Sequence, residues 1–193
     1  MINRETHVPE NAPPLGNALS RFIGRVIISM LGYKFEGKFA NEPKMVLIAA
    51  PHTSNWDLFL AIGTMLSLGV RINFMMKKEA FFFPFGGLFK ALGGVMLDRS
   101  SPKKAVISTL KTFKTREKLW MVILPEGTRK PVDKWKSGFA RIAKAANVPV
   151  FIMGVDSRTK TLHLDRLVNA GETPEDIRLY TKKKFTGINP KND

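Results

Sequence analysis

Apolar positions along the chain fall into two patterns, one typical of strands and one of helices. Short continuous apolar runs predict buried strands at residues 45–50, 72–76, 95–97, 119–124, 148–155 and 161–164. Apolar side chains at helical spacing predict helices over Trp56–Leu68, over residues 86–92 and around residues 139–146. Ser101-Pro102 and Thr173-Pro174 favour two further helix starts, with proline at the first helical position. This alternation predicts an α/β fold, a single domain with a mostly parallel central β-sheet flanked by helices.

The N-terminal region has a different pattern. Residues 1–14 are polar and contain proline, so we expect a flexible tail there and a single domain over residues 15–193. Residues 15–33 predict a basic amphipathic helix, because Arg21 and Arg25 lie four positions apart among apolar residues at helical spacing. Such a helix either packs on the domain or lies in a membrane interface.

Composition narrows the classes of protein and of partner. A chain of 193 residues with 44% apolar content fits one domain with a sizeable core. The absence of cysteine excludes a disulfide framework, a thiolate metal site and a cysteine nucleophile. The net charge of +15 fits nucleic acid, an anionic membrane surface or anionic substrates. The basic residues are spread along the chain without a nucleic-acid-binding motif, so we expect no nucleic-acid partner.

The cellular location follows from the same composition. No segment has the roughly 20 consecutive apolar residues that span a bilayer, and the polar N-terminus does not resemble a signal peptide. Each Lys or Arg near an anionic leaflet contributes about 1 kcal/mol to binding. We therefore expect a cytoplasmic protein that is peripherally associated with a membrane.

Three polar clusters follow three of the predicted strands. Residues 52–57 follow the first strand, Asp98-Arg99 follows the third, and residues 126–129 follow the fourth. Ligands of parallel α/β sheets bind outside the carboxyl ends of the strands. If these strands are parallel, the three clusters share one edge of the sheet and form a single site.

His52 and Asp57 are the strongest chemical pair in these clusters. In a continuous helix, side chains five positions apart point about 140° away from each other, so the pair meets only across a turn. Pro51 and the Thr-Ser-Asn run after His52 favour such a turn. An imidazole oriented by a carboxylate is a general base. Ser54 and Asp57 also match a helix capping box, and both roles are compatible with the spacing.

Residues 126–129 combine a carboxylate, a glycine, a hydroxyl and a guanidinium. Gly127 lets the backbone approach a ligand, and Arg129 suits phosphate recognition. Glu126 could orient an arginine or accept a hydrogen bond from a substrate hydroxyl. An ordinary polar turn after a strand explains the same residues, just as a surface ion pair explains Asp98-Arg99.

Basic residues directly precede an aromatic cluster in the middle of the chain. Lys77-Lys78-Glu79 is followed by Phe81, Phe82, Phe83 and Phe85. Either the aromatic residues belong to the hydrophobic core and the charged residues before them face solvent, or the aromatic residues form an apolar surface. Such a surface would bind an apolar chain or insert into lipid.

Together and in this order, these clusters resemble the glycerolipid (lysophosphatidate, PlsC-type) acyltransferase family. His52, Ser54 and Asp57 match its H-x-S-x-x-D motif. Its motif of a glycine, apolar residues and an arginine matches residues 94–99, P-E-G-T-R matches residues 125–129, and the V-P strand matches residues 148–150. Lys78-Glu79 resembles the family's lysine–glutamate step. The resemblance covers about residues 44–155.

The resemblance implies transfer of an acyl group from a thioester, acyl-CoA or acyl-acyl-carrier protein, to a hydroxyl of a lysophospholipid or glycerol phosphate. It implies that His52 deprotonates the hydroxyl and that Asp57 orients His52. It further implies that the acceptor is bound by Arg99, Lys78, Glu126, Gly127, Thr128 and Arg129. It implies no metal and no tightly bound cofactor, and it makes acyl carrier protein an expected partner. The positive net charge adds an anionic membrane surface to the expected partners. The alternatives are a catalytically silent lipid-binding protein, and an acyltransferase for an acceptor without phosphate, such as an amino-lipid.

Overall fold

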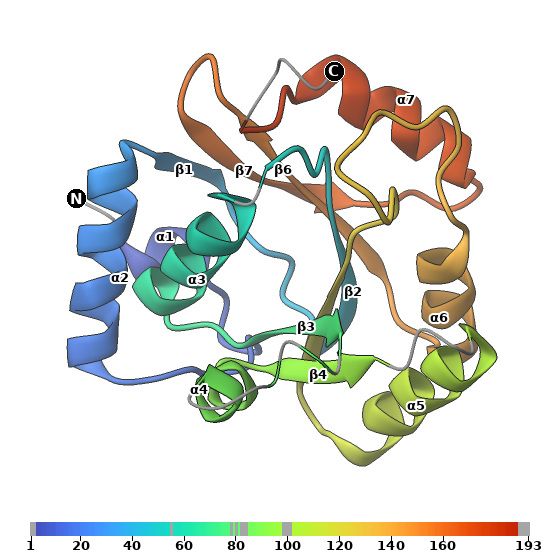
Figure 1. Ribbon diagram of the computed structural model, residues 1–193, viewed down its shortest axis with the longest axis horizontal. Coiled ribbons are helices and arrows are strands. Elements are labelled where there is room, and N and C mark those ends of the chain that lie inside the picture. The colour runs from blue at the N-terminus through green and yellow to red at the C-terminus, as the bar shows by residue number, and fades with distance from the viewer. Residues whose placement is uncertain are drawn as a thin grey trace.

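A seven-stranded sheet forms the centre of the molecule (Figure 1). The computed structural model describes residues 3–54, 56–77, 79, 81, 85–97 and 102–188. The strands are β1 (Lys34–Gly37), β2 (Lys44–Ala49), β3 (Ile72–Lys77), β4 (Gly94–Leu97), β5 (Leu119–Ile123), β6 (Val150–Asp156) and β7 (Thr161–Leu167). Their order is β1-β7-β6-β2-β5-β3-β4, and β6–β7 is antiparallel whereas the other neighbouring pairs are parallel. The prediction of a mostly parallel sheet is therefore confirmed.

Helices cover both faces of the sheet (Figure 1). The helices are α1 (Arg4–His7), α2 (Ala18–Leu31), α3 (Trp56–Leu68), α4 (Phe85–Ala91), α5 (Pro102–Thr115), α6 (Gly138–Ala146) and α7 (Pro174–Lys184). Helices α2 and α3 lie side by side on one face, and α5 and α6 lie on the other. The predicted helix starts at Pro102 and Pro174 are confirmed, and Thr173 and Asp176 form a reciprocal capping box before α7.

Strand β2 contributes to the cores on both faces of the sheet. Met45 and Leu47 belong to the core beneath α2 and α3, whereas Val46 and Ile48 belong to the core beneath α5 and α6. All four side chains have no exposed surface. Burying a side chain of this size is worth about 1.5–3 kcal/mol, which explains why the run is apolar at every position rather than at alternate ones.

Helix α2 packs closely on α3. A Cβ at Gly24 would lie 2.2 Å from the backbone nitrogen of Ser67, so the two helix backbones meet where α2 has no side chain. The outer face of α2 remains exposed, with Phe22 58% and Met30 83% accessible. No helix in the described part of the chain combines the length and apolar character needed to cross a bilayer.

The N-terminal segment packs on the domain, which corrects the expectation of a flexible tail for residues 3–14. The Nε–H of Arg4 in α1 donates to the carbonyl of Leu68 at 3.0 Å, and His7 Nδ1 lies 2.6 Å from the carbonyl oxygen of Gly37. Val8 and Ala12 are buried in the core beneath α2 and α3. These isolated apolar residues, spaced among polar residues and prolines, have no helical or strand periodicity to reveal them.

Candidate active site

The turn after β2 positions the two residues of the predicted pair. The peptide bond between Ala50 and Pro51 is cis, and residues 51–54 lead into α3. The carboxylate of Asp57 accepts hydrogen bonds from the backbone N–H groups of Thr53 and Ser54, at 3.1 and 3.0 Å, through its Oδ2. Ser54 Oγ accepts in turn from the N–H of Trp56 at 3.2 Å. The capping role inferred for Ser54 and Asp57 is therefore present.

The same carboxylate oxygen contacts the histidine. His52 Nδ1 lies 2.6 Å from Asp57 Oδ2, and the two side chains are 22% and 19% exposed. With Nδ1–H donating to the carboxylate, the lone pair of the neutral imidazole is on Nε2. The arrangement can therefore take a proton from a bound group at Nε2 while the carboxylate stabilises the imidazolium.

Glu126 connects the second polar cluster to this pair. Its Oε2 accepts a hydrogen bond from the backbone N–H of His52 at 2.7 Å, across 74 residues of sequence. The contact forms because β5, which precedes Glu126, lies next to β2 in parallel register. The predicted meeting of these two clusters at one sheet edge is confirmed. A carboxylate acceptor makes this hydrogen bond stronger than one between neutral groups.

The turn that carries Glu126 is built from the residues of the P-E-G-T-R motif. Gly127 has φ +67°, and its N–H donates to the carbonyl of Leu124 at 3.1 Å. Thr128 Oγ1 accepts from the N–H of Lys130 at 3.2 Å. Thus the glycine and the hydroxyl both shape the turn, and Arg129 follows on an exposed position.

Lys136 is a basic residue at this turn that the sequence reasoning missed. A Cβ at Gly127 would lie 2.9 Å from Lys136 Nζ, so the lysine stem lies along the face that glycine leaves open. The N–H of Lys136 donates to the carbonyl of Pro125 at 3.0 Å. Nothing in the periodicity marks Lys136, and its position depends on the loop that leads to α6.

Two predicted substrate-binding residues, Lys78 and Arg99, lie outside the described residues, as does Asp98. The same holds for residues 82–84 of the aromatic cluster. Phe81 is described, and its ring packs edge-on against Phe89 of α4 at a centroid distance of 6.4 Å.

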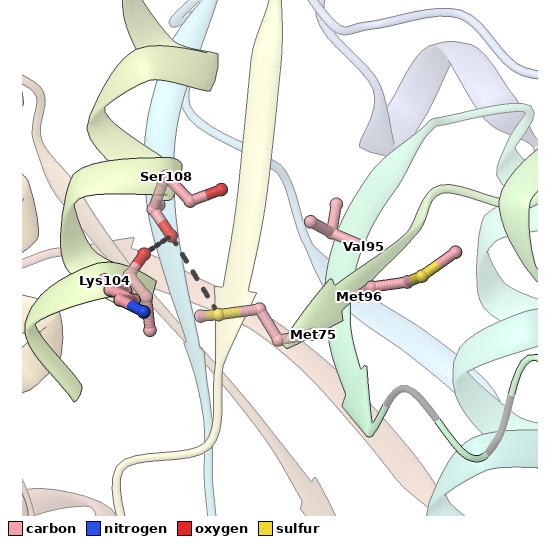
Figure 2. Close-up of a pocket in the computed structure, with 7 residues that line it drawn as sticks. Met75, Val95, Met96, Lys104 and Ser108 are labelled. Carbon is pink, nitrogen blue, oxygen red and sulfur yellow. Dashed lines mark hydrogen bonds between the residues drawn. The ribbon is translucent and has the colours of Figure 1, made fainter. Parts of the chain in front are cut away.

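A small hollow opens between α5 and the neighbouring strands β3 and β4 (Figure 2). Its volume is about 120 Å³, and it is lined by Met75, Val95, Met96, Lys104, Ala105, Ser108 and Thr109. On the helix side, the hydroxyl of Thr109 donates to the carbonyl of Ala105 at 2.8 Å. On the strand side, Met75 and Val95 are apolar lining residues. None of the predicted site residues that the structure describes lines this hollow.

Tyr33 is a second residue that the sequence reasoning did not single out. Its hydroxyl is buried and has no hydrogen-bond partner among the described residues. Burial, followed by the negative charges of Asp57 and Asp156, raises the pKa of this hydroxyl. The ammonium of Lys160 lies 5.0 Å from the centre of the Tyr33 ring.

In the described part of the chain, no group of three side chains that could bind a metal ion is found.

Comparison with known proteins finds relatives of this chain. The acyltransferase family profile matches residues 33–155. The 1-acyl-sn-glycerol-3-phosphate acyltransferase of Escherichia coli is 30% identical over 172 residues, which are 83% of this chain and 66% of that protein. The protein of the same name from Pseudomonas aeruginosa is 30% identical over 130 residues, 64% of this chain and 49% of that protein. The chain thus spans about half the length of several curated relatives that it matches.

A solved structure shows the same fold. The crystal structure of the 1-acyl-sn-glycerophosphate acyltransferase PlsC from Thermotoga maritima superposes with a TM-score of 0.61 at 19% identity. The match covers 86% of this chain and 75% of the Thermotoga chain. The α/β architecture is therefore that of a known acyltransferase. Because the family profile also spans more than half of the sequence and includes both polar clusters, the chain belongs to the acyltransferase family.

Proposed function

We propose that this protein transfers a fatty acyl group from an acyl thioester to a hydroxyl of a lysophospholipid or glycerol-phosphate acceptor. The contact of 2.6 Å between His52 Nδ1 and Asp57 Oδ2, in a turn held by Glu126, carries the proposal. Membership of the acyltransferase family supports the reaction class. The relatives named 1-acyl-sn-glycerol-3-phosphate acyltransferase support the acceptor class.

His52 acts as the general base in the proposed mechanism. Nε2 takes the proton of the acceptor hydroxyl as its oxygen attacks the carbonyl carbon of the thioester. The tetrahedral intermediate then collapses, the carbon–sulfur bond breaks, and the thiolate takes the proton from Nε2. Asp57 keeps Nε2 unprotonated at the start by accepting from Nδ1–H, and it stabilises the imidazolium between the two steps. No step uses a metal or a bound cofactor.

Basic side chains around the P-E-G-T-R turn bind the acceptor phosphate in this proposal. Arg129 supplies a guanidinium suited to two parallel hydrogen bonds with phosphate, and Arg99 and Lys78 add further positive charge. Gly127 and Thr128 shape the turn that presents Arg129. Acyl-CoA and acyl-acyl-carrier protein both fit as donors, because both present a thioester on an anionic carrier.

A lysophospholipid acceptor would be held in a membrane, and the surface of α2 and α3 is suited to reach one. Exposed apolar side chains gather on these neighbouring helices, namely Leu19, Phe22, Ile23, Val26, Met30, Trp56 and Phe59. Arg21 and Arg25 are half-buried residues on an adjoining side of α2. We therefore propose that this apolar face, with the basic residues beside it, rests on an anionic membrane surface on the cytoplasmic side.

Turnover by wild-type protein and by a histidine variant tests the reaction. Purified protein is incubated with long-chain acyl-CoA or acyl-acyl-carrier protein and a panel of lysophospholipids, and the diacyl product is measured. His52→Ala removes the general base, so kcat should fall by about 10²-fold or more. His7→Ala is the matched control, because His7 is a half-buried histidine on α1 whose ring contacts Gly37 and not the His52 turn.

Equal rates in wild type and His52→Ala would contradict the role of His52. Absence of product with every donor and acceptor, together with lipid binding, would favour the catalytically silent lipid-binding protein. Turnover of amino-lipid acceptors alone would keep the reaction and replace the acceptor.

A further inference from the structure

A segment after α7 lies against the turn that carries His52. Residues 185–188, which we call the post-α7 segment, come after α7 in the sequence and lie beside the carboxyl end of β6. The N–H groups of Thr186 and Gly187 both donate to the carbonyl of Val155, at 3.1 and 2.9 Å. Gly187 also forms a parallel bridge with Asp156. The segment therefore extends the sheet edge at which His52 and Glu126 meet.

The contact with the turn is made through Thr53, the residue after His52. The N–H of Ile188 donates to Thr53 Oγ1 at 3.0 Å, across 135 residues of sequence. Thr53 is 5% exposed, and its own N–H donates to Asp57 Oδ2 at 3.1 Å. Thr53 thus connects the carboxylate that orients His52 with the post-α7 segment.

Gly187 fits this contact because it has no side chain. A Cβ there would lie 2.6 Å from Thr53 Oγ1, 2.7 Å from Thr53 Cγ2 and 3.2 Å from Pro51 Cγ. Its φ of +74° is also in the left-handed region that favours glycine. Any larger residue must displace the side chains of Thr53 and Pro51 or the post-α7 segment itself.

The post-α7 segment is fixed on its other side. Thr186 Oγ1 donates to Asp156 Oδ1 at 3.0 Å, and the guanidinium of Arg158 donates to both oxygens of the same carboxylate. The Arg158 hydrogen bonds lower the pKa of Asp156 to about 2, so this anchor is charged at assay pH. Phe185 is buried in the core beneath α5 and α6. A displacement caused at Gly187 would therefore be transmitted to the turn rather than absorbed by the segment.

We propose that Gly187 and Ile188 are positioning residues that hold the turn carrying His52 in its productive geometry through Thr53. Both residues lie outside residues 33–155, the part that the family profile matches. Their kinetic role rests on the proposed acyl transfer. Their structural role, the alignment of His52 with Asp57, does not depend on the identity of the substrates.

The kinetic test compares two glycines with positive φ. Gly187→Ala should lower kcat by about tenfold or more and change the KM for either substrate by less than about twofold, because displacing a reacting group by about 1 Å can cost up to 10²-fold. Gly171→Ala is the matched control, since Gly171 has φ +90° and no atom within 4 Å of a Cβ. A kcat of Gly187→Ala equal to that of Gly171→Ala, with both variants folded, would overturn the proposal.

A second measurement is independent of turnover. The proton on His52 Nδ1 gives a low-field NMR signal, which is assigned by its absence in His52→Gln. We expect this signal to shift upfield or to be lost by exchange in Gly187→Ala, and to stay in place in Gly171→Ala. An unchanged signal in Gly187→Ala would overturn the positioning proposal. Absence of acyl transfer by wild-type protein would instead refute only the proposed reaction, because the NMR signal does not depend on turnover.

Variants of Thr53 keep the test decisive if Gly187→Ala does not fold. Thr53→Val preserves the shape and removes the acceptor of the Ile188 N–H, so it should shift the same signal and lower kcat. Thr53→Ser restores a hydroxyl and should recover most of both effects. Equal behaviour of the Val and Ser variants would overturn the proposal.

Discussion

At the scale of single residues, one carboxylate oxygen serves a helix and a candidate catalytic pair together. Asp57 Oδ2 accepts from the backbone of Thr53 and Ser54 and lies 2.6 Å from His52 Nδ1. The first turn of a helix favours a negative charge, because unpaired N–H groups and the helix dipole point toward it. The capping and orienting roles are therefore one arrangement, in which the cap fixes the carboxylate that the imidazole needs.

The hydrogen bond from the His52 N–H to Glu126 predicts a graded effect on rate. Glu126→Ala removes the acceptor at 2.7 Å, and we expect kcat to fall about tenfold or more, since a hydrogen bond to a charged group contributes about 1.5–3 kcal/mol. Glu126→Gln keeps an oxygen acceptor of the same length and should retain more activity than the alanine variant. Steady-state kinetics with varied acceptor measures both.

The separation of kcat from KM distinguishes the two roles considered for Glu126. If its carboxylate instead accepts a hydrogen bond from the acceptor hydroxyl, both variants would raise the KM for the acceptor and change kcat little. That pattern would contradict the positioning role.

At the scale of elements, the contact of α2 with α3 depends on a glycine. Gly24 lets the backbone of α2 approach Ser67 of α3, and Gly63 of α3 faces Ile27 and Ile28 of α2 in the same way. The two helices thereby pack as one unit on one face of the sheet.

Adding a methyl group at this contact should destabilise the domain. In Gly24→Ala, the Cβ would lie 2.2 Å from a backbone nitrogen, and such overpacking typically costs about 1–3 kcal/mol. Urea unfolding followed by circular dichroism measures the change. The control is Gly87→Ala in α4, which has nothing within 4 Å of a Cβ and should be neutral or stabilising. Equal stability of the two variants would show that the helices separate without cost.

At the scale of the whole molecule, a high positive charge is combined with exposed apolar residues on two neighbouring helices. The net charge is +15, and α2 and α3, which carry these exposed apolar side chains, lie side by side (Figure 1). A lipid acceptor reaches a site on such a protein without leaving the membrane if that face lies on the bilayer. The sequence left two alternatives for α2, packing on the domain or lying in a membrane interface. In this proposal both hold, because α2 packs on α3 with one side and exposes the other.

Binding to vesicles tests that face. Wild-type protein should sediment with vesicles of phosphatidylglycerol and phosphatidylcholine, and 1 M salt should weaken binding because the Debye length falls to about 3 Å. Phe22→Glu should weaken binding about tenfold or more, because it removes an exposed aromatic side chain that would be buried in the bilayer interface and adds a repelled charge. Leu179→Glu on α7 carries the same charge change at a residue that is 53% exposed. Equal weakening by both variants would contradict a specific role of α2.

The sequence predicted those parts of the fold that local patterns determine. The apolar run at residues 45–50 was sufficient to predict β2, and the helical spacing over Trp56–Leu68 was sufficient to predict α3. The polar residues after successive parallel strands were sufficient to predict that His52 and Glu126 lie close together. Strand β1 and α1 were missed because each has four residues and lacks a periodic pattern. The contacts of Lys136 with Gly127 and of Ile188 with Thr53 could not be predicted, since they depend on loop geometry and on long-range packing.

The hydrogen bond between Ile188 and Thr53 also determines when the site is completed during synthesis. The turn that carries His52 leaves the ribosome 135 residues before the last of its contacts, a delay of roughly 7–27 s at typical elongation rates. Early in this interval β2 still lacks its neighbours β5 and β6, and the hydrogen bond from Ile188 to Thr53 forms only at the end of it. A nascent chain can therefore bury helices α2 and α3 early and still be inactive, so that activity appears only when the whole domain has folded.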